Sequence, residues 1–308
     1  MAKKINLNVS QYSDEFRCVI NAALDVATQF DSDCPVRLRE AIRYSLLAPG
    51  KRLRPILVLT ACELCGDNRQ KAIPAACAVE MIHAYSLIHD DLPAMDNDDL
   101  RRGLPTCHKK FDEPTAILAG DALLALAFEM IGNLSPSELA GQCCKELAVA
   151  AGPCQLVGGQ MDDVYRPDSI ESGNIQIIER IHRRKTGALI RTSLRLGSLI
   201  AGASEEQQLA LDEFGIYFGL AFQITDDLLD VLGNEKTVGK RLRKDTENDK
   251  WSYPRFLGID GARREVARTL ELAEHSLEIF RNNKNIRNDN IALETLYSMV
   301  KHLAEREK

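Results

Sequence analysis

The stretch HAYSLIHDDLPAMDNDD, residues 83–99, joins an apolar helical pattern to a run of aspartates. Apolar residues recur from Ala78 through Tyr85 and Ile88 at the spacing of one helix face, which predicts a helix beginning near Ala78. Pro93 cannot occupy a helix interior without breaking it, so the helix is expected to end within the aspartates.

A second acidic cluster, DDLLD at residues 226–230, ends a long apolar stretch that begins near Leu209. Asp226 and Asp230 are four residues apart and therefore share a helix face. Gly233 follows as the expected C-terminal cap. Both clusters are thus predicted at the C-terminal ends of helices.

Helical periodicity also covers residues 116–131 and 263–280, and almost no run alternates apolar and polar residues as a strand would. The chain has 308 residues, 45% of them hydrophobic, and contains no linker-like segment. We therefore predict an all-α fold, a bundle of long helices around a central cavity, in a single domain over residues 1–308.

Carboxylates at a helix C-terminus face the negative end of the helix dipole, and adjacent aspartates also repel each other. A divalent cation offsets both effects, and all-oxygen ligands without histidine or thiolate favour Mg²⁺. Because Mg²⁺ often bridges carboxylates to phosphate oxygens, the pattern indicates a diphosphate ligand. A solvated Asp-rich turn would explain one cluster, but two matched clusters far apart in sequence favour the metal site.

Basic residues form further clusters beside the acidic ones. They are Lys51-Arg52-Leu53-Arg54, Arg101-Arg102, Arg183-Arg184-Lys185, Lys236 to Lys240, and Lys250. Arginine binds phosphate through two parallel hydrogen bonds and lysine binds it as a point charge. The sequence has no phosphate-binding P-loop motif. With a net charge of −6, it also gives no indication of nucleic-acid binding.

The chain start lacks the apolar core of a signal peptide, and the most apolar stretch, residues 116–128, is too short to cross a bilayer. Nine cysteines without a secretion signal indicate reduced thiols, so we expect a soluble cytoplasmic protein without a membrane span. Cys62 and Cys65 form a C-x-x-C pair, but no second pair stands at zinc-ligand spacing.

From Gly50 to Pro254 the chain resembles the trans-isoprenyl diphosphate synthases, most closely the bacterial farnesyl diphosphate synthases. The matching motifs are GKRLRP at 50–55, residues 83–96, LRRG at 100–103, LAGDA at 118–122, GGQ at 158–160, KTG at 185–187, Phe222-Gln223 before Asp226, Gly239-Lys240 and Asp249-Lys250. The resemblance implies condensation of isopentenyl diphosphate with an allylic diphosphate, dimethylallyl or geranyl, by a helical homodimer that uses up to three Mg²⁺.

The resemblance also implies roles for matched residues. Metal ligation falls to Asp90, Asp96 and Asp226, with Asp91, Asp227 and Asp230 acting through water or by orientation. The allylic diphosphate is neutralised by Arg101, Lys185, Lys240 and Lys250. Isopentenyl diphosphate is bound without metal by Lys51, Arg54, His83 and Arg102. Thr186 and Gln223 face the reacting allyl group, and together with Lys185 are the catalytic residues.

Tyr85 lies about 7.5 Å back along the helix from Asp90, because each helical residue rises about 1.5 Å. Its ring is placed to form the floor of the chain pocket, and the resemblance associates an aromatic residue there with a C15 product. The alternatives are an ordinary core position for Tyr85 and a geranylgeranyl diphosphate synthase with a C20 product. A non-catalytic partner subunit is disfavoured by the two complete acidic clusters, and a terpene cyclase by the isopentenyl site. A structural helical protein is the remaining alternative.

Overall fold

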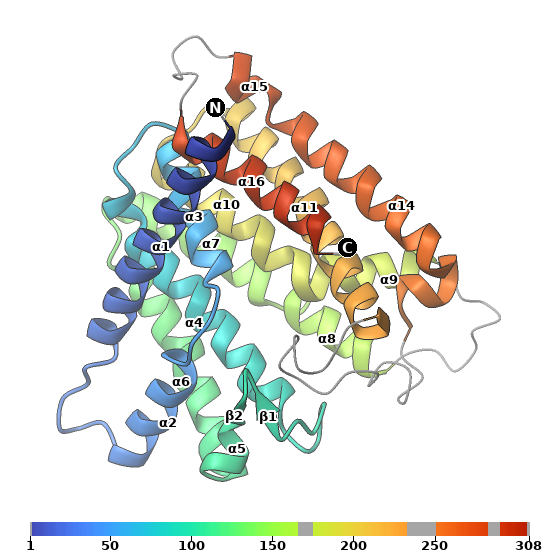
Figure 1. Ribbon diagram of the computed structural model, residues 1–308. Helices are drawn as coiled ribbons and strands as arrows, with labels where there is room; N and C mark the ends of the chain where they lie inside the picture. The colour runs from blue at the N-terminus through green and yellow to red at the C-terminus, as the bar shows by residue number, and fades with distance from the viewer. Residues whose placement is uncertain (1, 166–174, 233–250, 283–289, 307–308) are drawn as a thin grey trace.

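The computed structural model describes residues 2–165, 175–232, 251–282 and 290–306. It is built from helices (Figure 1), which confirms the predicted all-α class. The helices before residue 133 are α1 (Ala2–Ala27), α2 (Val36–Leu46), α3 (Leu53–Leu64), the short η1 (Arg69–Ala72), α4 (Ile73–Asp90), α5 (Cys107–Lys110) and α6 (Glu113–Gly132). The later ones are α7 (Ser137–Ala151), α8 (Leu156–Val164), α9 (Ile175–His182), the π-helical η3 (Arg183–Gly187), α10 (Ala188–Ile200), α11 (Glu205–Leu232), α14 (Tyr253–Ser276), α15 (Glu278–Asn282) and α16 (Ile291–Glu305).

The predicted helices are present with shifted ends. Helix α4 begins at Ile73, five residues before the predicted start, and ends at Asp90, ahead of Pro93. The pattern over residues 263–280 is divided between α14 and α15, and α14 already begins at Tyr253. The prediction of a Gly233 cap lies outside the described residues.

One short hairpin was not predicted. Strands β1 (Leu100–Arg101) and β2 (Leu104–Pro105) pair antiparallel, with Leu100 opposite Pro105. The two connecting residues, Arg102 and Gly103, have φ of 54° and 78°. Positive φ at both positions is typical of the tight turn that joins two antiparallel strands. The hairpin therefore places Arg101 and Arg102 directly after the acidic turn.

Helices α3, α4, α10 and α11 carry long buried stretches that contribute to one apolar cluster extending from Tyr12 to Leu303. Gly197 of α10 lies against α3 so closely that a Cβ there would stand 2.2 Å from the carbonyl oxygen of Val58. A larger residue would push the two helices apart. The single domain over residues 1–308 stays a prediction, which this shared cluster supports.

A buried ion pair fixes the start of α3. Arg52 Nη1 donates to Glu80 Oε1 of α4 at 2.7 Å, and both side chains are almost fully buried. Its Nη2 donates to the carbonyl oxygens of Leu46 and Ala48 at 2.9 Å, and its Nε donates to Asn21 Oδ1 at 2.9 Å. The Arg52 guanidinium thus links α1, helix α4 and the C-terminal end of α2 to the basic segment that contains Lys51 and Arg54.

Removing the charge of Glu80 leaves Arg52 buried without a counter-charge. We expect Glu80→Gln to lower the free energy of unfolding by about 3 kcal/mol, because breaking a buried pair from one side costs far more than the pair contributes. Urea denaturation measures the loss.

The exposed Arg17–Asp14 pair provides the control. Asp14→Asn should cost less than about 1 kcal/mol, since exposed ion pairs contribute little. Equal losses in the two variants would contradict the anchoring role of Arg52.

Candidate active site

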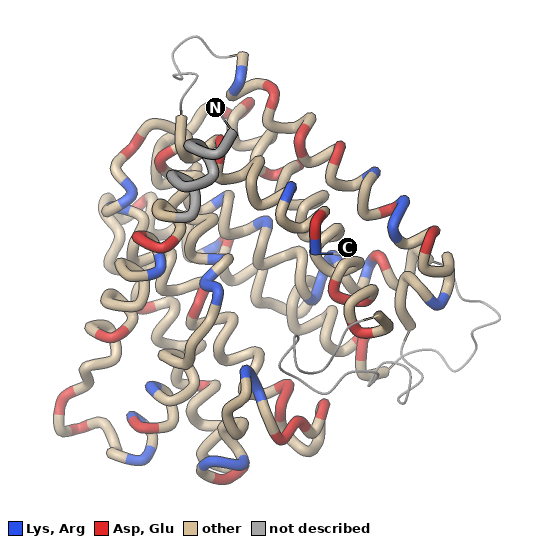
Figure 2. Tube along the Cα trace, viewed as in Figure 1, with Lys and Arg blue, Asp and Glu red and all other residues tan. Residues whose placement is uncertain are grey.

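The two acidic clusters lie at the ends of α4 and α11, on the same side of the bundle. Figure 2 shows the acidic turn after α4 and the acidic end of α11 at the lower side of the view. In the first cluster the chain folds back, because the amide of Asp96 donates to the carbonyl oxygen of Asp90 at 2.9 Å. This turn brings together the two carboxylates that were predicted to ligate metal.

Asp90 is in an environment that disfavours its charge. Burial raises the pKa of Asp90 to about 6, and Asp96 and Asp91 add to the effect while Lys185 and Arg101 oppose it. A cation near Asp90 and Asp96 would remove this penalty. Among the residues that the structure describes, no three His, Cys, Asp or Glu side chains are already gathered as a metal site.

Asp91 has a different role from its neighbour. Its two carboxylate oxygens accept from Nε and Nη2 of Arg101 at 2.5 to 2.9 Å, and Asp91 is buried. Asp98 lies 3.7 Å from the same guanidinium. Arg101, which was predicted to neutralise the allylic diphosphate, is therefore held beside the acidic turn by Asp91.

Lys185 of the π-helical turn η3 pairs with α8 and interacts electrostatically with the first acidic cluster. Its Nζ donates to Asp163 Oδ2 of α8 at 2.8 Å. Burial alone would lower its pKa, but Asp163, Asp90 and Asp96 raise the pKa of Lys185 overall. Asp163 was missed by the sequence reasoning, although the acidic pair after GGQ was a visible signal.

Helix α8 can approach this turn because residue 159 is glycine. A Cβ at Gly159 would stand 2.4 Å from the backbone nitrogen of Lys185. Thr186 and Gln223, both predicted to face the allyl group, are in direct contact, since Thr186 Oγ1 donates to Gln223 Oε1 at 2.7 Å. The turn therefore presents Lys185 and Thr186 between α8 and α11.

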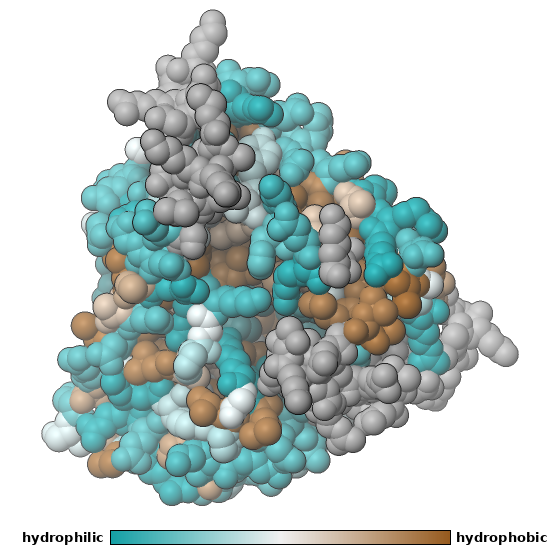
Figure 3. All heavy atoms as spheres, in the orientation of Figure 1, coloured by the Kyte–Doolittle hydropathy of each residue, from teal (hydrophilic) through white to brown (hydrophobic). Residues whose placement is uncertain are grey.

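The second cluster faces the basic loop before α3. Asp226 lies 3.8 Å from Arg306 of the C-terminal segment, and it acts electrostatically on Lys51 and Arg54. Lys51 and Arg306 also line a recess between α16 and α3. Figure 3 shows apolar residues at the bottom of a recess in the middle of this face, with hydrophilic residues around it.

Of the residues predicted to bind isopentenyl diphosphate, Arg54 and Arg102 lie near His83, whereas Lys51 lies near Asp226 and Arg306. Burial lowers the pKa of His83 well below its usual value, and Arg54, Arg102, Arg101 and Arg52 lower it further. Within the described part of the chain, the buried Nε of Arg54 has no hydrogen-bond partner. A neutral imidazole among four guanidinium groups is a strongly cationic environment that suits an anion.

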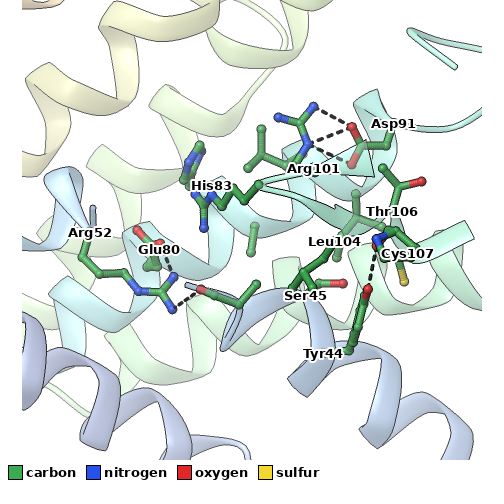
Figure 4. Close-up of a pocket in the computed structure, with 16 residues that line it drawn as sticks. Tyr44, Ser45, Arg52, Glu80, His83, Asp91, Arg101, Leu104, Thr106 and Cys107 are labelled. Atoms are coloured by element: carbon green, nitrogen blue, oxygen red, sulfur yellow. Dashed lines mark hydrogen bonds and ion pairs between the residues drawn. The ribbon is translucent and has the colours of Figure 1, made fainter. Parts of the chain in front are cut away.

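The pocket beside His83 lies between two ion pairs. Figure 4 shows His83 between the Arg52–Glu80 pair and the Arg101–Asp91 pair. The backbone of Arg102 has positive φ, and its Nη1 donates to the carbonyl oxygen of Pro49 at 3.1 Å. Gly50 makes room for it, because a Cβ at residue 50 would lie 2.4 Å from the same nitrogen.

Tyr85 is buried on α4, one turn before His89, and the two rings meet edge to face with centroids 5.8 Å apart. Burial raises the pKa of Tyr85 to about 12, with Asp90 adding to the shift. Tyr85 and Asp90 lie on one helix, as the sequence predicts. The role of Tyr85 as the floor of the pocket for the prenyl chain stays a prediction. Lys240 and Lys250 lie outside the described residues.

The cysteines are free thiols. Burial raises the pKa of Cys62 and of Cys65 to about 12, so neither is an activated thiol. One described helix, α6, is long and apolar enough to cross a membrane by length and composition, and 33% of its most apolar window is buried. One such helix is weak evidence for a membrane span.

Residues 35–286 match the family model described as polyprenyl synthetase. A farnesyl diphosphate synthase of Geobacillus stearothermophilus is 43% identical, over 88% of this chain and 92% of that protein. A chloroplastic geranylgeranyl pyrophosphate synthase of Capsicum annuum is 45% identical, over 90% of this chain and 75% of that protein.

Solved structures agree. A geranyltransferase from Legionella pneumophila superimposes with a TM-score of 0.85 at 33% identity, covering 98% of this chain and 99% of that one. An FPP/GFPP synthase from Zymomonas mobilis gives a TM-score of 0.81 at 33% identity, covering 97% and 100%. The chain belongs to the polyprenyl synthetase family.

Proposed function

We propose that this protein is a farnesyl diphosphate synthase that condenses isopentenyl diphosphate with dimethylallyl and then geranyl diphosphate. The proposal is supported chiefly by two clusters of charged residues that differ in composition and lie on the same side of the bundle. One combines the carboxylates of Asp90 and Asp96 with Lys185, as a metal-bound diphosphate requires. The other combines Lys51, Arg54, Arg102 and a neutral His83, as a diphosphate without metal requires.

Mg²⁺ fits the first site, because Asp90 and Asp96 are hard oxygen donors whose mutual repulsion and burial favour a bound cation. Asp90, Asp96 and Asp226 would hold up to three ions. The ions would neutralise the charge that develops on the departing diphosphate. Lys185 adds a fixed positive charge on the same side.

The remaining steps use the positions of the chain's own residues. The allylic C–O bond breaks and its electron pair leaves with the diphosphate, while the oxygens of Thr186 and Gln223 stabilise the allylic cation. Lys51, Arg54 and Arg102 hold isopentenyl diphosphate so that its double bond meets that cation. The terminal carbon of that double bond joins the allylic carbon, which leaves the positive charge on the neighbouring tertiary carbon. The adjacent CH₂ group then loses a proton to the released diphosphate, and a new double bond forms.

A second candidate, geranylgeranyl diphosphate synthesis, is favoured by the similarity to the Capsicum annuum enzyme. The buried ring of Tyr85 supports the shorter product. The isopentenyl site argues against a terpene cyclase, and the two complete acidic clusters argue against an inactive subunit. Nine free thiols suit a reducing compartment such as the cytoplasm.

A homodimer through α6 is also part of the proposal. Ile117 and Leu118 of this helix are 44% and 58% exposed, and Leu124 and Phe128 are only partly buried. Exposed apolar side chains on one helix face favour a protein partner. Asp121 and Glu129 on the outer side of α6 are unsuited to lipid, so we assign the face to a second copy of the chain.

The first test is product analysis after incubation with labelled isopentenyl diphosphate and dimethylallyl diphosphate. We expect a C15 product with Mg²⁺ and none with chelator.

Asp90→Ala should lower turnover by about a hundredfold or more, because metal-ion charge stabilisation is worth several kcal/mol. Asp99 of the same turn pairs with Lys109 at 2.9 Å on the surface, so Asp99→Ala should stay within about twofold, since exposed ion pairs contribute little. Near-normal turnover by Asp90→Ala would overturn the metal assignment.

Product length tests the floor role of Tyr85. Tyr85→Ala removes the ring and should shift the product to C20 or longer, measured by chromatography of the dephosphorylated products. Tyr85→Phe keeps the ring and should retain the C15 product. An unchanged profile in Tyr85→Ala would show that another residue ends the chain pocket.

The dimer is tested by sedimentation equilibrium. Leu118→Asp places a charge in the proposed interface and should shift the protein from dimer to monomer, because burying an unpaired carboxylate is costly. Leu209→Asp, at an equally exposed apolar position on α11, should leave the dimer intact. A dimer that persists in Leu118→Asp would exclude this face.

A further inference from the structure

A chain of hydrogen bonds runs from Thr186 into the protein. Thr186 Oγ1 donates to Gln223 Oε1 at 2.7 Å, and Gln223 Nε2 donates to Asp227 Oδ1 at 3.4 Å. The other carboxylate oxygen, Asp227 Oδ2, accepts from the backbone N–H of Tyr253 at 3.0 Å and lies 3.0 Å from His182 Nε2. Asp227 therefore connects α9, α11 and the start of α14.

The direction of each bond in this chain follows from chemistry. An ionised carboxylate only accepts hydrogen bonds, so His182 Nε2 and the amide NH₂ of Gln223 must donate to Asp227. With its NH₂ committed, Gln223 presents its carbonyl oxygen to Thr186. The hydroxyl of Thr186 must then donate, which leaves its oxygen lone pairs free to face another group.

The end of this hydrogen-bond chain at Asp227 and His182 is buried and held by several contacts. Asp227 and His182 are 5% and 8% exposed, and the rings of His182 and Tyr253 stack with centroids 5.6 Å apart. His182 directly precedes the π-helical turn that carries Lys185 and Thr186. Single π-helical turns recur at functional sites, where they redirect side chains. Fixing His182 therefore fixes the start of the turn that presents Thr186.

We propose that Asp227 and His182 are positioning residues that set the direction of the Thr186 hydroxyl, so that its oxygen rather than its hydrogen faces the reacting allylic carbon. This inference rests on the proposed prenyl transfer and deepens it. An oxygen lone pair stabilises the allylic cation, whereas a hydroxyl hydrogen in the same place repels it. Asp227 thus acts differently from its neighbour Asp226, which faces the basic loop.

Asp227→Asn gives a specific test because the shape of the side chain is kept. The N–H of Tyr253 still requires an acceptor, so the new amide must keep its oxygen there and turn its NH₂ toward Gln223. Two facing NH₂ groups force the Gln223 amide to flip, and Thr186 then accepts instead of donating. We expect kcat to fall roughly tenfold or more, with KM for both diphosphates and the Mg²⁺ dependence within about twofold.

A double-mutant cycle with Thr186→Val shows whether Asp227 acts through the hydroxyl. If it does, Asp227→Asn lowers kcat in the wild-type background and has little further effect in Thr186→Val. Independent, multiplicative losses would overturn the proposal. A raised Mg²⁺ requirement or raised KM with unchanged kcat in Asp227→Asn would overturn it too, because both indicate metal or substrate binding by Asp227.

His182 provides the second comparison. His182→Gln keeps a donor toward Asp227 and should retain most of kcat, whereas His182→Leu removes it and should lower kcat at unchanged KM. Equal losses in the two variants would contradict the role of His182. The wild-type protein distinguishes failure of the proposed function from failure of this inference. If the wild type gives no Mg²⁺-dependent product, the proposed function and this inference are both overturned. If the wild type is active and the losses in the double-mutant cycle multiply, only this inference is overturned.

Discussion

Repulsion between carboxylates at two helix ends is the constraint around which this site is arranged. Asp90-Asp91 ends α4 and Asp226-Asp227 lies in the last turns of α11, where the helix dipole adds to the unfavourable charge. Successive helical residues point about 100° apart, so the two members of each pair face different surroundings. In each pair one carboxylate is buried in the protein, Asp91 or Asp227, and the other, Asp90 or Asp226, is partly exposed.

The inward members form hydrogen bonds with the protein itself. Asp91 binds Arg101 through both carboxylate oxygens, and Asp227 binds His182 and the backbone of Tyr253. Each inward aspartate thereby positions a neighbouring functional group, the guanidinium in one case and the Gln223 amide in the other. Asp90 is left with a pKa raised to about 6, which means that its charge is not fully compensated by the chain alone. Burial also raises the pKa of Asp91 despite its hydrogen bonds to Arg101, so the first acidic cluster as a whole would be stabilised by a bound cation.

The sequence predicted the parts of this arrangement that depend on local pattern. Apolar periodicity located α4, α6 and α11, because this signal lies within a few turns of chain. The paired aspartates and basic runs supplied the candidate site residues, whose roles stay predictions. The turn formed by Arg102 and Gly103 was missed, since two-residue strands leave almost no periodicity. The Lys185–Asp163 and Asp227–His182 contacts were missed for another reason: they join residues 22 and 45 positions apart, and only tertiary packing brings them together.

The same electrostatics explain how a site can sort two substrates that carry identical diphosphate groups. Around His83 the guanidinium groups outnumber the carboxylates, and burial together with this surplus of positive charge lowers the pKa of the imidazole. Around Asp90 the three carboxylates of Asp90, Asp91 and Asp96 outnumber the two cations of Lys185 and Arg101, so we expect this site to favour a metal-bound diphosphate over a bare one. In the proposed reaction the basic loop therefore selects the diphosphate without metal and the acidic helix ends select the metal complex. Only the metal-bound diphosphate is activated to leave. This makes the allylic substrate the electrophile and isopentenyl diphosphate the nucleophile.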